Sequence, residues 1–317
     1  MINPITVTAG IDTGKKFLDI ALHPGGETLQ VPNDATGHRR LTAWLASHAV
    51  ERIGIEASGG YERTVVECLR RAGLAVQVLQ PLQVRAFATY KLRRAKNDRL
   101  DAALIAVCVA GIEPARTPPD PRLTGLGEQL RLIEQLEADL VRARTRLETY
   151  REARPRRFQT AEIRRLERRL AAEKASLLKE VAAHDDLTRR LALIESVEGI
   201  GRRTALTLLL LMPELGSLSR EQAAALAGLA PFDRESSSYK GSRHIAGGRA
   251  RVRRALFAAA FPASFHWNTA LRALYTRLTA AGKPHKKALI ACARKLLIFA
   301  NTVLQRGSNW QKITASS

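Results

Sequence analysis

A proline cluster divides this chain into two parts with different hydrophobic periods. Four prolines fall within residues 114–121, a composition typical of a linker. Before this cluster, short runs alternate apolar and polar residues as β-strands do. After it, Leu126, Ile133, Leu140 and Leu147 recur at intervals of seven residues, which is typical of long helices that pack along a narrow stripe. We therefore predict an α/β part followed by helical parts.

Residues 1–115 have the pattern of a mixed α/β domain. Three strand-like runs follow one another, and helices then alternate with two further strands. Strands are predicted at 5–12, 17–22, 28–31, 52–56 and 75–79, and helices at 36–47 and 61–71. A three-strand meander followed by alternating helices and strands is the order expected of a ribonuclease-H/RuvC-like mixed sheet.

The helical part is predicted to begin with a long hairpin over residues 122–185. Leu130 and Leu136 fill in the heptad stripe, Pro155 breaks it, and a second apolar stripe continues from Ile163 to Val181. This pattern predicts a coiled-coil helical hairpin. Its many arginines are explained as well by solvated helix faces as by nucleic-acid contacts. Residues 186–317 are predicted to form a mainly helical domain.

A Gly199-Ile200-Gly201 turn lies between two predicted helices of that last domain. In a helix-hairpin-helix, such a turn exposes backbone N–H groups that bind a phosphate without reading sequence. A simple tight turn explains the two glycines equally well.

The charge of the chain predicts a polyanionic partner. It carries 51 Lys+Arg against 30 Asp+Glu, a net charge of +21, which favours nucleic acid over a membrane surface. The most apolar run, Leu206–Met212, is far shorter than the ~18 residues of a membrane-spanning helix. Aromatic residues make up only 5% of the chain, which argues against a stacking platform for single strands. The scattered Cys68, Cys108 and Cys292 predict reduced thiols in a cytoplasmic protein and no zinc site.

Four acidic residues stand out within this basic sequence. Asp12 and Glu56 each end a strand-like run, whereas Asp98 and Asp101 lie one turn apart at the start of an apolar helix. If the two strands are parallel neighbours, both carboxylates meet at their carboxyl ends. Taken singly, each acid is explained by a turn or a helix terminus. Together they form the layout that two-metal phosphoryl transfer requires, with oxygen ligands suited to Mg²⁺ or Mn²⁺.

A second candidate site lies between residues 231 and 254. Glycines, serines and cations alternate there, and a helix follows. The cations would neutralise phosphates, and the glycines would let the backbone approach closely. A serine hydroxyl such as that of Ser236 can attack phosphorus if it is activated. The alternative is a flexible surface loop in which the serines have no role.

These motifs together resemble one known family. The amino-terminal motifs are Gly10-Ile11-Asp12-x-x-Lys15, Glu56-Ala57-Ser58-Gly59-Gly60-Tyr61 and Lys96-Asn97-Asp98-x-x-Asp101-Ala102. The carboxyl-terminal motifs are Gly199 and Gly201, Ala227-Gly228-Leu229-Ala230-Pro231, and a serine followed by Gly241-Ser242-Arg243-His244-Ile245-Ala246-Gly247-Gly248-Arg249. Over nearly its whole length the chain resembles the DEDD transposases of bacterial insertion sequences, recombinases associated with a bridge RNA.

The resemblance implies a division of labour along the chain. Residues 1–115 would be a RuvC-like catalytic domain, 122–185 dimerisation helices and 186–317 the transposase domain. Asp12, Glu56, Asp98 and Asp101 would bind Mg²⁺ or Mn²⁺, and Ser236 would become transiently linked to a DNA end. The acids and the serine of one working site would come from different subunits of a dimer or dimer of dimers. The implied nucleic-acid contacts are Lys96, Gly199, Gly201, Lys240, Arg243, Arg249 and Arg253.

Two departures from the family pattern bear on these roles. The family usually has Ser-Gly where this chain has Ser236-Ser237, so the attacking hydroxyl can belong to Ser236 or to a neighbouring serine. The first motif reads Asp-Thr-Gly-Lys where Asp-Val-Ser-Lys is common.

The leading hypothesis is a metal-dependent recombinase that moves its own insertion sequence, guided by RNA and acting on double-stranded DNA in the bacterial cytoplasm at the nucleoid. A site-specific DNA invertase of the same architecture is a close alternative. A RuvC-like junction-resolving nuclease would cut by water attack and would need no serine. A non-catalytic nucleic-acid-binding scaffold would need none of the acids.

Overall fold

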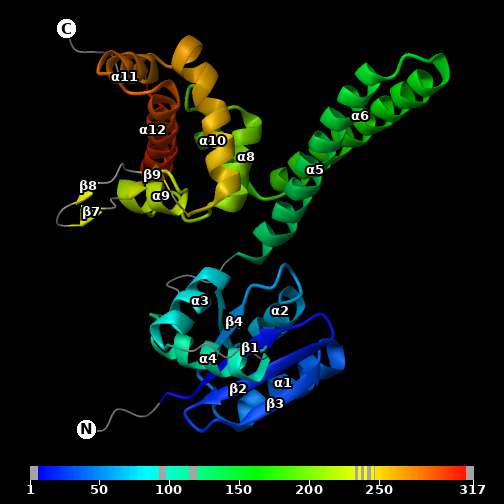
Figure 1. Ribbon diagram of the computed structural model, residues 1–317, viewed down its shortest axis with the longest axis vertical. Helices are drawn as coiled ribbons and strands as arrows, with labels where there is room; N and C mark the ends of the chain where they lie inside the picture. Colours follow the sequence, from blue (N-terminus) through cyan, green and yellow to red (C-terminus); the bar gives the residue numbers. More distant parts are fainter. Residues whose placement is uncertain are drawn as a thin grey trace. The chain divides into compact units, whose positions relative to one another are not determined.

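The computed structural model describes residues 6–92, 98–113, 120–232, 235–236, 239–240, 244–245 and 247–311. The chain folds into two compact units, Met1–Pro118 and Pro119–Ser317. The first contains a sheet with helices and the second is mainly helical (Figure 1). Their boundary falls inside the proline cluster. A further division of the helical part near residue 185 stays a prediction.

The first unit contains a five-stranded mixed sheet. Its strands are β1 (Thr8–Thr13), β2 (Phe17–His23), β3 (Thr28–Pro32), β4 (Arg52–Glu56) and β5 (Ala75–Leu79). Their order across the sheet is β3-β2-β1-β4-β5. The first three form an antiparallel meander, and β4 and β5 continue in parallel with β1. This order confirms the mixed sheet predicted from the sequence.

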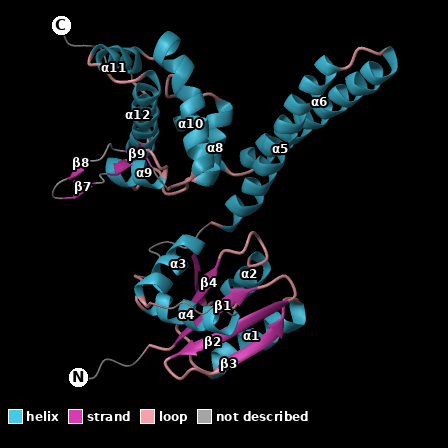
Figure 2. Cartoon of the chain, viewed as in Figure 1, coloured by secondary structure: helices cyan, strands magenta, loops and turns pink. Residues whose placement is uncertain are grey.

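Helices cover both faces of this sheet (Figure 2). On one face, α1 (Ala35–Ser47) and α2 (Arg63–Arg71) bury Leu41 and Leu69 against strand residues such as Ile11, Ile20 and Ile55. The other face carries α3 (Pro81–Tyr90) and α4 (Asp98–Ala110). The sequence pattern did not predict α3. It is a short helix that begins with a proline at its first position and a capping box between Gln80 and Gln83.

The second unit begins with the predicted helical hairpin. Helices α5 (Pro121–Thr149) and α6 (Ala153–Ala182) lie side by side (Figure 1). Leu130, Ile133 and Leu177 are among the buried residues of the stripe. The break comes three residues earlier than predicted, because Pro155 lies in the first turn of α6, where its missing N–H costs nothing. Coiled-coil geometry and a dimerising role stay predictions.

The rest of the second unit is mainly helical. Its elements are α7 (Asp185–Glu195), α8 (Arg202–Leu211), α9 (Arg220–Leu226), β6 (Pro231–Phe232), β7 (Glu235–Ser236), β8 (Tyr239–Lys240), β9 (His244–Ile245), α10 (Ala250–Pro262), the π-helical turn η1 (Ala263–Trp267), α11 (Thr269–Ala280) and α12 (His285–Arg306). Helix α12 lies at its centre, where Leu289, Cys292 and Leu296 are fully buried or nearly so.

Helix α12 corrects one expectation from the sequence. With a mean hydropathy of 1.4 over its most apolar stretch, it is long and apolar enough to cross a membrane, unlike Leu206–Met212. However, 56% of that stretch is buried inside the protein, as expected of the core helix of a helical domain. Its length and composition therefore carry little weight as evidence for a membrane.

Candidate active site

Two of the predicted acids lie on neighbouring parallel strands. Strand β1 pairs with β4 so that Ile11 lies opposite Ile55. Asp12 and Glu56 are the next residues of these strands, and both are half-buried. The condition stated from the sequence, that these two strands are parallel neighbours, is thus met. Because side chains alternate along a strand, the two carboxylates belong to the face opposite the Ile11 and Ile55 core.

Helix α4 rests directly on that face because glycines replace side chains there. A Cβ atom at Gly10 would lie 2.1 Å from the Ala102 carbonyl oxygen, and one at Gly54 would lie 3.0 Å from Ile105 Cγ2. The Thr8 hydroxyl donates a hydrogen bond of 2.9 Å to the Ala106 carbonyl. Since Thr8 meets the later turn and Gly10 the earlier one, α4 runs antiparallel to β1.

This antiparallel direction brings the start of α4 toward the end of β1 that carries Asp12. Asp101 immediately precedes Ala102, and its side chain is half-buried. Asp98 is the first residue of α4, although its side chain lies outside the described residues, as does all of Lys96. Backbone packing therefore gathers the elements that bear all four predicted acids at one end of the sheet.

A fifth carboxylate, which the sequence pattern did not single out, lies beside Asp12. Asp19 of β2 is directly opposite Asp12 across the antiparallel pair, so both side chains are on the same face. Asp19 is 8% exposed and accepts a 2.9 Å hydrogen bond from Gln30 Nε2 of β3. Like charges at opposed positions destabilise a sheet unless a cation compensates them.

The oxygen atoms of these carboxylates are the type of ligand that a hard divalent cation prefers. Asp12, Glu56 and Asp101 offer only carboxylate oxygens, the ligands that Mg²⁺ and Mn²⁺ prefer. Among the side chains that the structure describes, however, no group of three acids, histidines or cysteines is close enough together to hold a metal. The backbone thus supplies the arrangement of the elements, and the metal itself stays a prediction.

The loop that follows Glu56 is held in shape by Glu62. Its Oε2 accepts hydrogen bonds from Ser58 N at 3.0 Å, Ser58 Oγ at 3.0 Å and Gly60 N at 2.8 Å. Partial burial opposes ionisation of this carboxyl, but the hydrogen bonds from the backbone of Glu62, Gly60 and Ser58 and from the Ser58 hydroxyl outweigh it and lower its pKa. Gly59 and Gly60 both have positive φ, which explains the glycine pair in this motif.

The predicted nucleophile lies on a short β-arm of the second unit, formed by β6 to β9 (Figure 1). Pro231 pairs with Ile245 in the β6–β9 sheet, and Ser236 pairs with Tyr239 in the β7–β8 hairpin. The backbone of Ser236 is therefore placed in β7. Its side chain, the neighbouring serines 237 and 238, the Lys240 side chain and Arg243 lie outside the described residues.

Three glycines hold the base of this arm together. Gly228, Gly247 and Gly248 all have positive φ. A Cβ atom at Gly248 would lie 2.2 Å from Gly228 N, and one at Gly228 would lie 2.3 Å from the Gly247 carbonyl oxygen. Arg249 N donates a 2.9 Å hydrogen bond to the Leu226 carbonyl at the same place. The glycine motif noted in the sequence thus allows two backbone segments to touch.

Two arginines predicted to contact nucleic acid are engaged within the unit. Arg249 forms two hydrogen bonds to Glu214, of 2.7 and 2.6 Å, and one of 2.9 Å to the Leu211 carbonyl. Arg253 donates to the Gly247 carbonyl at 2.6 Å. Burial opposes ionisation of Glu214, but its hydrogen bonds with Arg249 outweigh this and lower its pKa. These contacts stabilise the base of the arm.

The turn between α7 and α8 contains the other predicted glycines. Gly199 has a φ of 100°, and a Cβ atom there would lie 2.4 Å from Ala263 Cβ, so close packing requires it. Gly201 caps the amino terminus of α8, and within the described residues a Cβ there would meet no atom within 4 Å. Gly201 therefore leaves the first turn of α8 open, and phosphate binding there stays a prediction.

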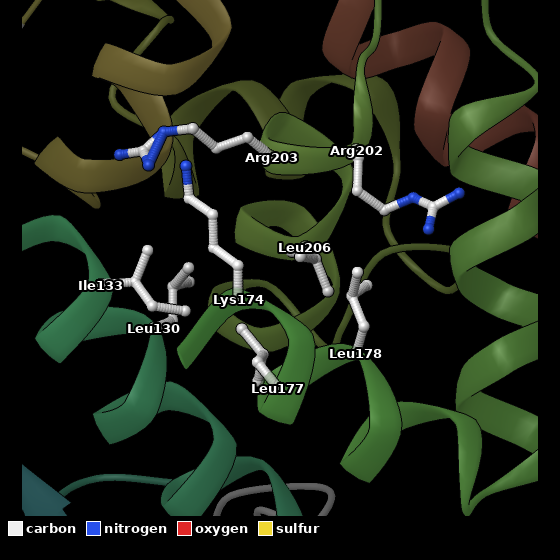
Figure 3. Close-up of a pocket in the computed structure, with 8 residues that line it drawn as sticks. All are labelled: Leu130, Ile133, Lys174, Leu177, Leu178, Arg202, Arg203 and Leu206. Atoms are coloured by element: carbon white, nitrogen blue, oxygen red, sulfur yellow. The ribbon is translucent and has the colours of Figure 1, made fainter. Parts of the chain in front are cut away.

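A leucine-lined pocket of about 180 Å³ lies where the hairpin packs on α8 (Figure 3). Lys174 and Arg203 stand at its rim and both pair with Glu137, while Arg202 pairs with Glu195. The pocket contains none of the predicted site residues. Its apolar lining residues are Leu130, Ile133, Leu177, Leu178 and Leu206.

Comparisons with known proteins agree with these features. Residues 9–153 match a family model described as a transposase, of the DEDD type of IS110, and residues 191–276 match the transposase IS116/IS110/IS902 family. The chain is 27% identical over 316 residues to the pilin gene-inverting proteins of Moraxella lacunata and Moraxella bovis, covering 96% of this chain and 97% of each relative. It is 33% identical over 120 residues to an uncharacterized 43.6 kDa protein of insertion element IS110 from Streptomyces coelicolor, covering 37% of this chain and 29% of that protein.

Among solved structures, the chain is similar to T. thermophilus RuvC in complex with a Holliday junction substrate. The identity is 17%, the match covers 32% of this chain and 91% of RuvC, and the TM-score is 0.28. At this TM-score the likeness carries no argument about the fold, which rests on the strand order of the sheet.

Proposed function

Since this chain belongs to the IS110/IS116 family of transposases, which are DNA-processing enzymes, we propose that it moves its own insertion sequence by metal-dependent cleavage and rejoining of DNA strands. A guide RNA would select the DNA sites. The main support is the placement of Asp12 and Glu56 at the ends of adjacent parallel strands, with α4 packed on the same face. Carboxyl ends of strands are where open α/β sheets bind ligands.

Asp12, Glu56, Asp98 and Asp101 would hold the divalent cation. When bound, Mg²⁺ would neutralise the charge of the scissile phosphate and stabilise the charge that develops on it. Asp19, buried beside Asp12, would add to the negative field that attracts the cation. Glu62 would keep the loop after Glu56 in one conformation.

The Ser236 hydroxyl would act as the attacking group. Its oxygen would form a bond to phosphorus while the bond from phosphorus to one bridging oxygen of the DNA backbone breaks. The serine proton would leave to a base, and the cleaved strand would end in a hydroxyl. Attack of a strand hydroxyl on the phosphoserine would then restore a phosphodiester and release the serine, so that no external energy source is needed.

A working site assembled from two subunits is part of the proposal. The acids of one protomer would act with the serine of another, and the α5–α6 hairpin would join the protomers. The heptad stripe is buried within the hairpin of one protomer, so other faces of α5 and α6 would make this contact. The protein would act in the bacterial cytoplasm at the nucleoid.

The decisive experiment incubates the protein with Mg²⁺ and DNA that carries the ends of its own element. A denaturant-resistant protein–DNA adduct mapped by mass spectrometry to Ser236 is expected, and Ser236→Ala should abolish it. Ser237→Ala and Ser238→Ala are the matched controls. DNA cleavage that continues in all three variants would instead support a junction-resolving nuclease that uses water. RNA that co-purifies from the native host would test the guide.

Site-specific inversion is the second candidate function. It is favoured by similarity over nearly the whole chain to proteins named as pilin gene-inverting. A plasmid with two sites in inverted orientation distinguishes the two activities, because an invertase flips the segment between them whereas an insertion-sequence transposase excises or inserts the element.

A further inference from the structure

We propose that the second unit carries a stacking site for unpaired bases of single-stranded DNA, formed by Phe261, Phe265, Tyr275 and His285. We call these four residues the aromatic patch. They come from four consecutive elements, α10, η1, α11 and α12; the three α-helices are labelled in Figure 1. The choice of DNA over other polyanions rests on the proposed function, whereas the patch itself does not.

The rings of the patch contact one another. The centroids of Phe261 and Phe265 are 5.4 Å apart, and those of Phe265 and Tyr275 are 4.9 Å apart, both in edge-to-face geometry. His285 stacks on Phe265 with centroids 6.4 Å apart, and its Nδ1 lies 2.6 Å from the Tyr275 hydroxyl. Each ring is thereby held in place by its neighbours.

The patch faces solvent even though it is apolar. Phe261 is 50% exposed and Phe265 36% exposed, and His285 is also exposed. Tyr275 is half-buried and packs against the core. Only 16 residues of the chain are Phe, Tyr or Trp, so three of them in one cluster is a marked concentration. Exposed aromatic clusters of this kind mark interaction sites. They lie around η1, a π-helical turn, and such turns occur frequently at functional sites.

The charge around the patch favours a polyanion. After Glu235 the sequence contains Lys and Arg but no Asp or Glu, and two of these cations, Arg249 and Arg251, pair with Glu214 and Glu134. Lys283, Lys286 and Lys287 are exposed next to His285, at the positive end of the α12 dipole. Arg272 donates a 2.9 Å hydrogen bond to the Phe265 carbonyl and so lies beside the rings.

Aromatic faces flanked by cations are the elements of single-strand recognition, because every base offers a face for stacking and every phosphate a charge. A duplex hides its base faces, so it cannot use the rings. A second copy of the same face would bring like charges together, which disfavours self-association there. Strand exchange exposes unpaired bases, and the patch would hold them.

The test measures binding of a fluorescein-labelled oligothymidylate strand to the full-length protein without divalent metal, so that no cleavage occurs. Phe261→Ala with Phe265→Ala should weaken binding of the single strand roughly ten-fold and leave the affinity for a duplex of equal length unchanged. Phe265→Trp should retain binding. The matched control is Phe158→Ala on α6, which removes a ring that is 75% exposed outside the patch and should have no effect.

A second measurement uses the unaltered protein, in case the double variant does not fold. A strand with 5-iododeoxyuridine should cross-link on irradiation within residues 261–285. Cross-links only elsewhere, or equal losses of single-strand and duplex binding, would overturn the proposal. Tighter, patch-dependent binding of oligouridylate would overturn the assignment to DNA, and a patch-dependent change in oligomeric state without loss of strand binding would assign the patch to self-association.

The same binding measured with Asp12→Ala separates this inference from the proposed function. The variant should bind the strand as the original protein does, because the rings of the patch and the cations beside them would carry this binding. If the catalytic proposal then fails, the proposal that the patch binds single strands is not affected. If instead the patch fails to bind the strand, the proposal that the four predicted acids hold a divalent cation is not affected.

Discussion

Gly10 of β1 lies against Ala102 of α4 so closely that a methyl group on Gly10 would be 2.1 Å from the Ala102 carbonyl oxygen. Strand and helix therefore meet backbone to backbone, without a layer of side chains between them. Asp12 is two residues beyond Gly10 and Asp101 one residue before Ala102. The spacing of the two acids is set by this contact.

Gly10→Ala should displace α4 and destabilise the first unit by at least about 2 kcal/mol, as overpacking of a rigid contact does. Hydrogen exchange of β1 and α4 measured by mass spectrometry should show faster exchange at both. Gly125→Ala in α5 is the control, because among the described residues nothing lies within 4 Å of a Cβ there. It should stabilise its helix by up to about 1 kcal/mol. Unchanged exchange in Gly10→Ala would mean that α4 can move away without cost.

Asp19→Asn should raise the Mg²⁺ concentration needed for half-maximal adduct formation, on the order of ten-fold. The fold should not change, because the asparagine oxygen can still accept the hydrogen bond from Gln30. Asp34→Asn is the control, since Asp34 caps α1, which packs on the opposite face of the sheet from Asp12 and Asp19. An Mg²⁺ dependence equal to that of the original protein would show that Asp19 plays no part in attracting the cation.

Glu62 should make stability depend on pH in the acid range. Its pKa in the folded protein is below the ordinary value of 4.5, so its ionised form stabilises the fold above that pH. The contribution is lost as the pH falls below 4.5 through the lower, folded pKa. Glu62→Gln should cost about 1 kcal/mol at neutral pH, and the difference should shrink with acidification. Urea unfolding across this range measures it, and a difference that stays constant with pH would contradict the assignment.

Arg249→Ala and Glu214→Ala should impair strand transfer to a similar degree, because each removes the ion pair at the base of the β-arm. A double-mutant cycle should give a coupling of about 1 kcal/mol in stability, since both side chains are partly exposed and the solvent weakens their attraction. If Arg249 instead acts by binding a phosphate, Glu214→Ala would leave DNA binding intact or strengthen it while Arg249→Ala weakens it.

The sheet was predictable because its strands alternate cleanly. The predicted bounds of 52–56 and 75–79 coincide with β4 and β5, where apolar side chains line one or both faces. Helix α3 was missed because it is only ten residues long and begins at Pro81, a residue that is also common in turns. The hairpin turn was misplaced by three residues, since a proline is as acceptable in the first turn of a helix as in a loop.

The candidate site was only partly predictable, for a related reason. Acids at the ends of strands, such as Asp12 and Glu56, are visible in the sequence. Asp19 lies in the middle of an apolar strand, and only the pairing of β1 with β2 reveals that it faces Asp12. The low aromatic content argued against a stacking platform, and the role proposed for the aromatic patch runs against that expectation, because composition does not show how folding gathers the rings.

The bare contact between β1 and α4 has a consequence for how such an enzyme can diversify. Surface loops can be lengthened or exchanged while the spacing of Asp12 and Asp101 stays set by two backbones in contact in the interior. A change on the surface can therefore leave the arrangement of the carboxylates unaltered, whereas a side chain at position 10 would move them.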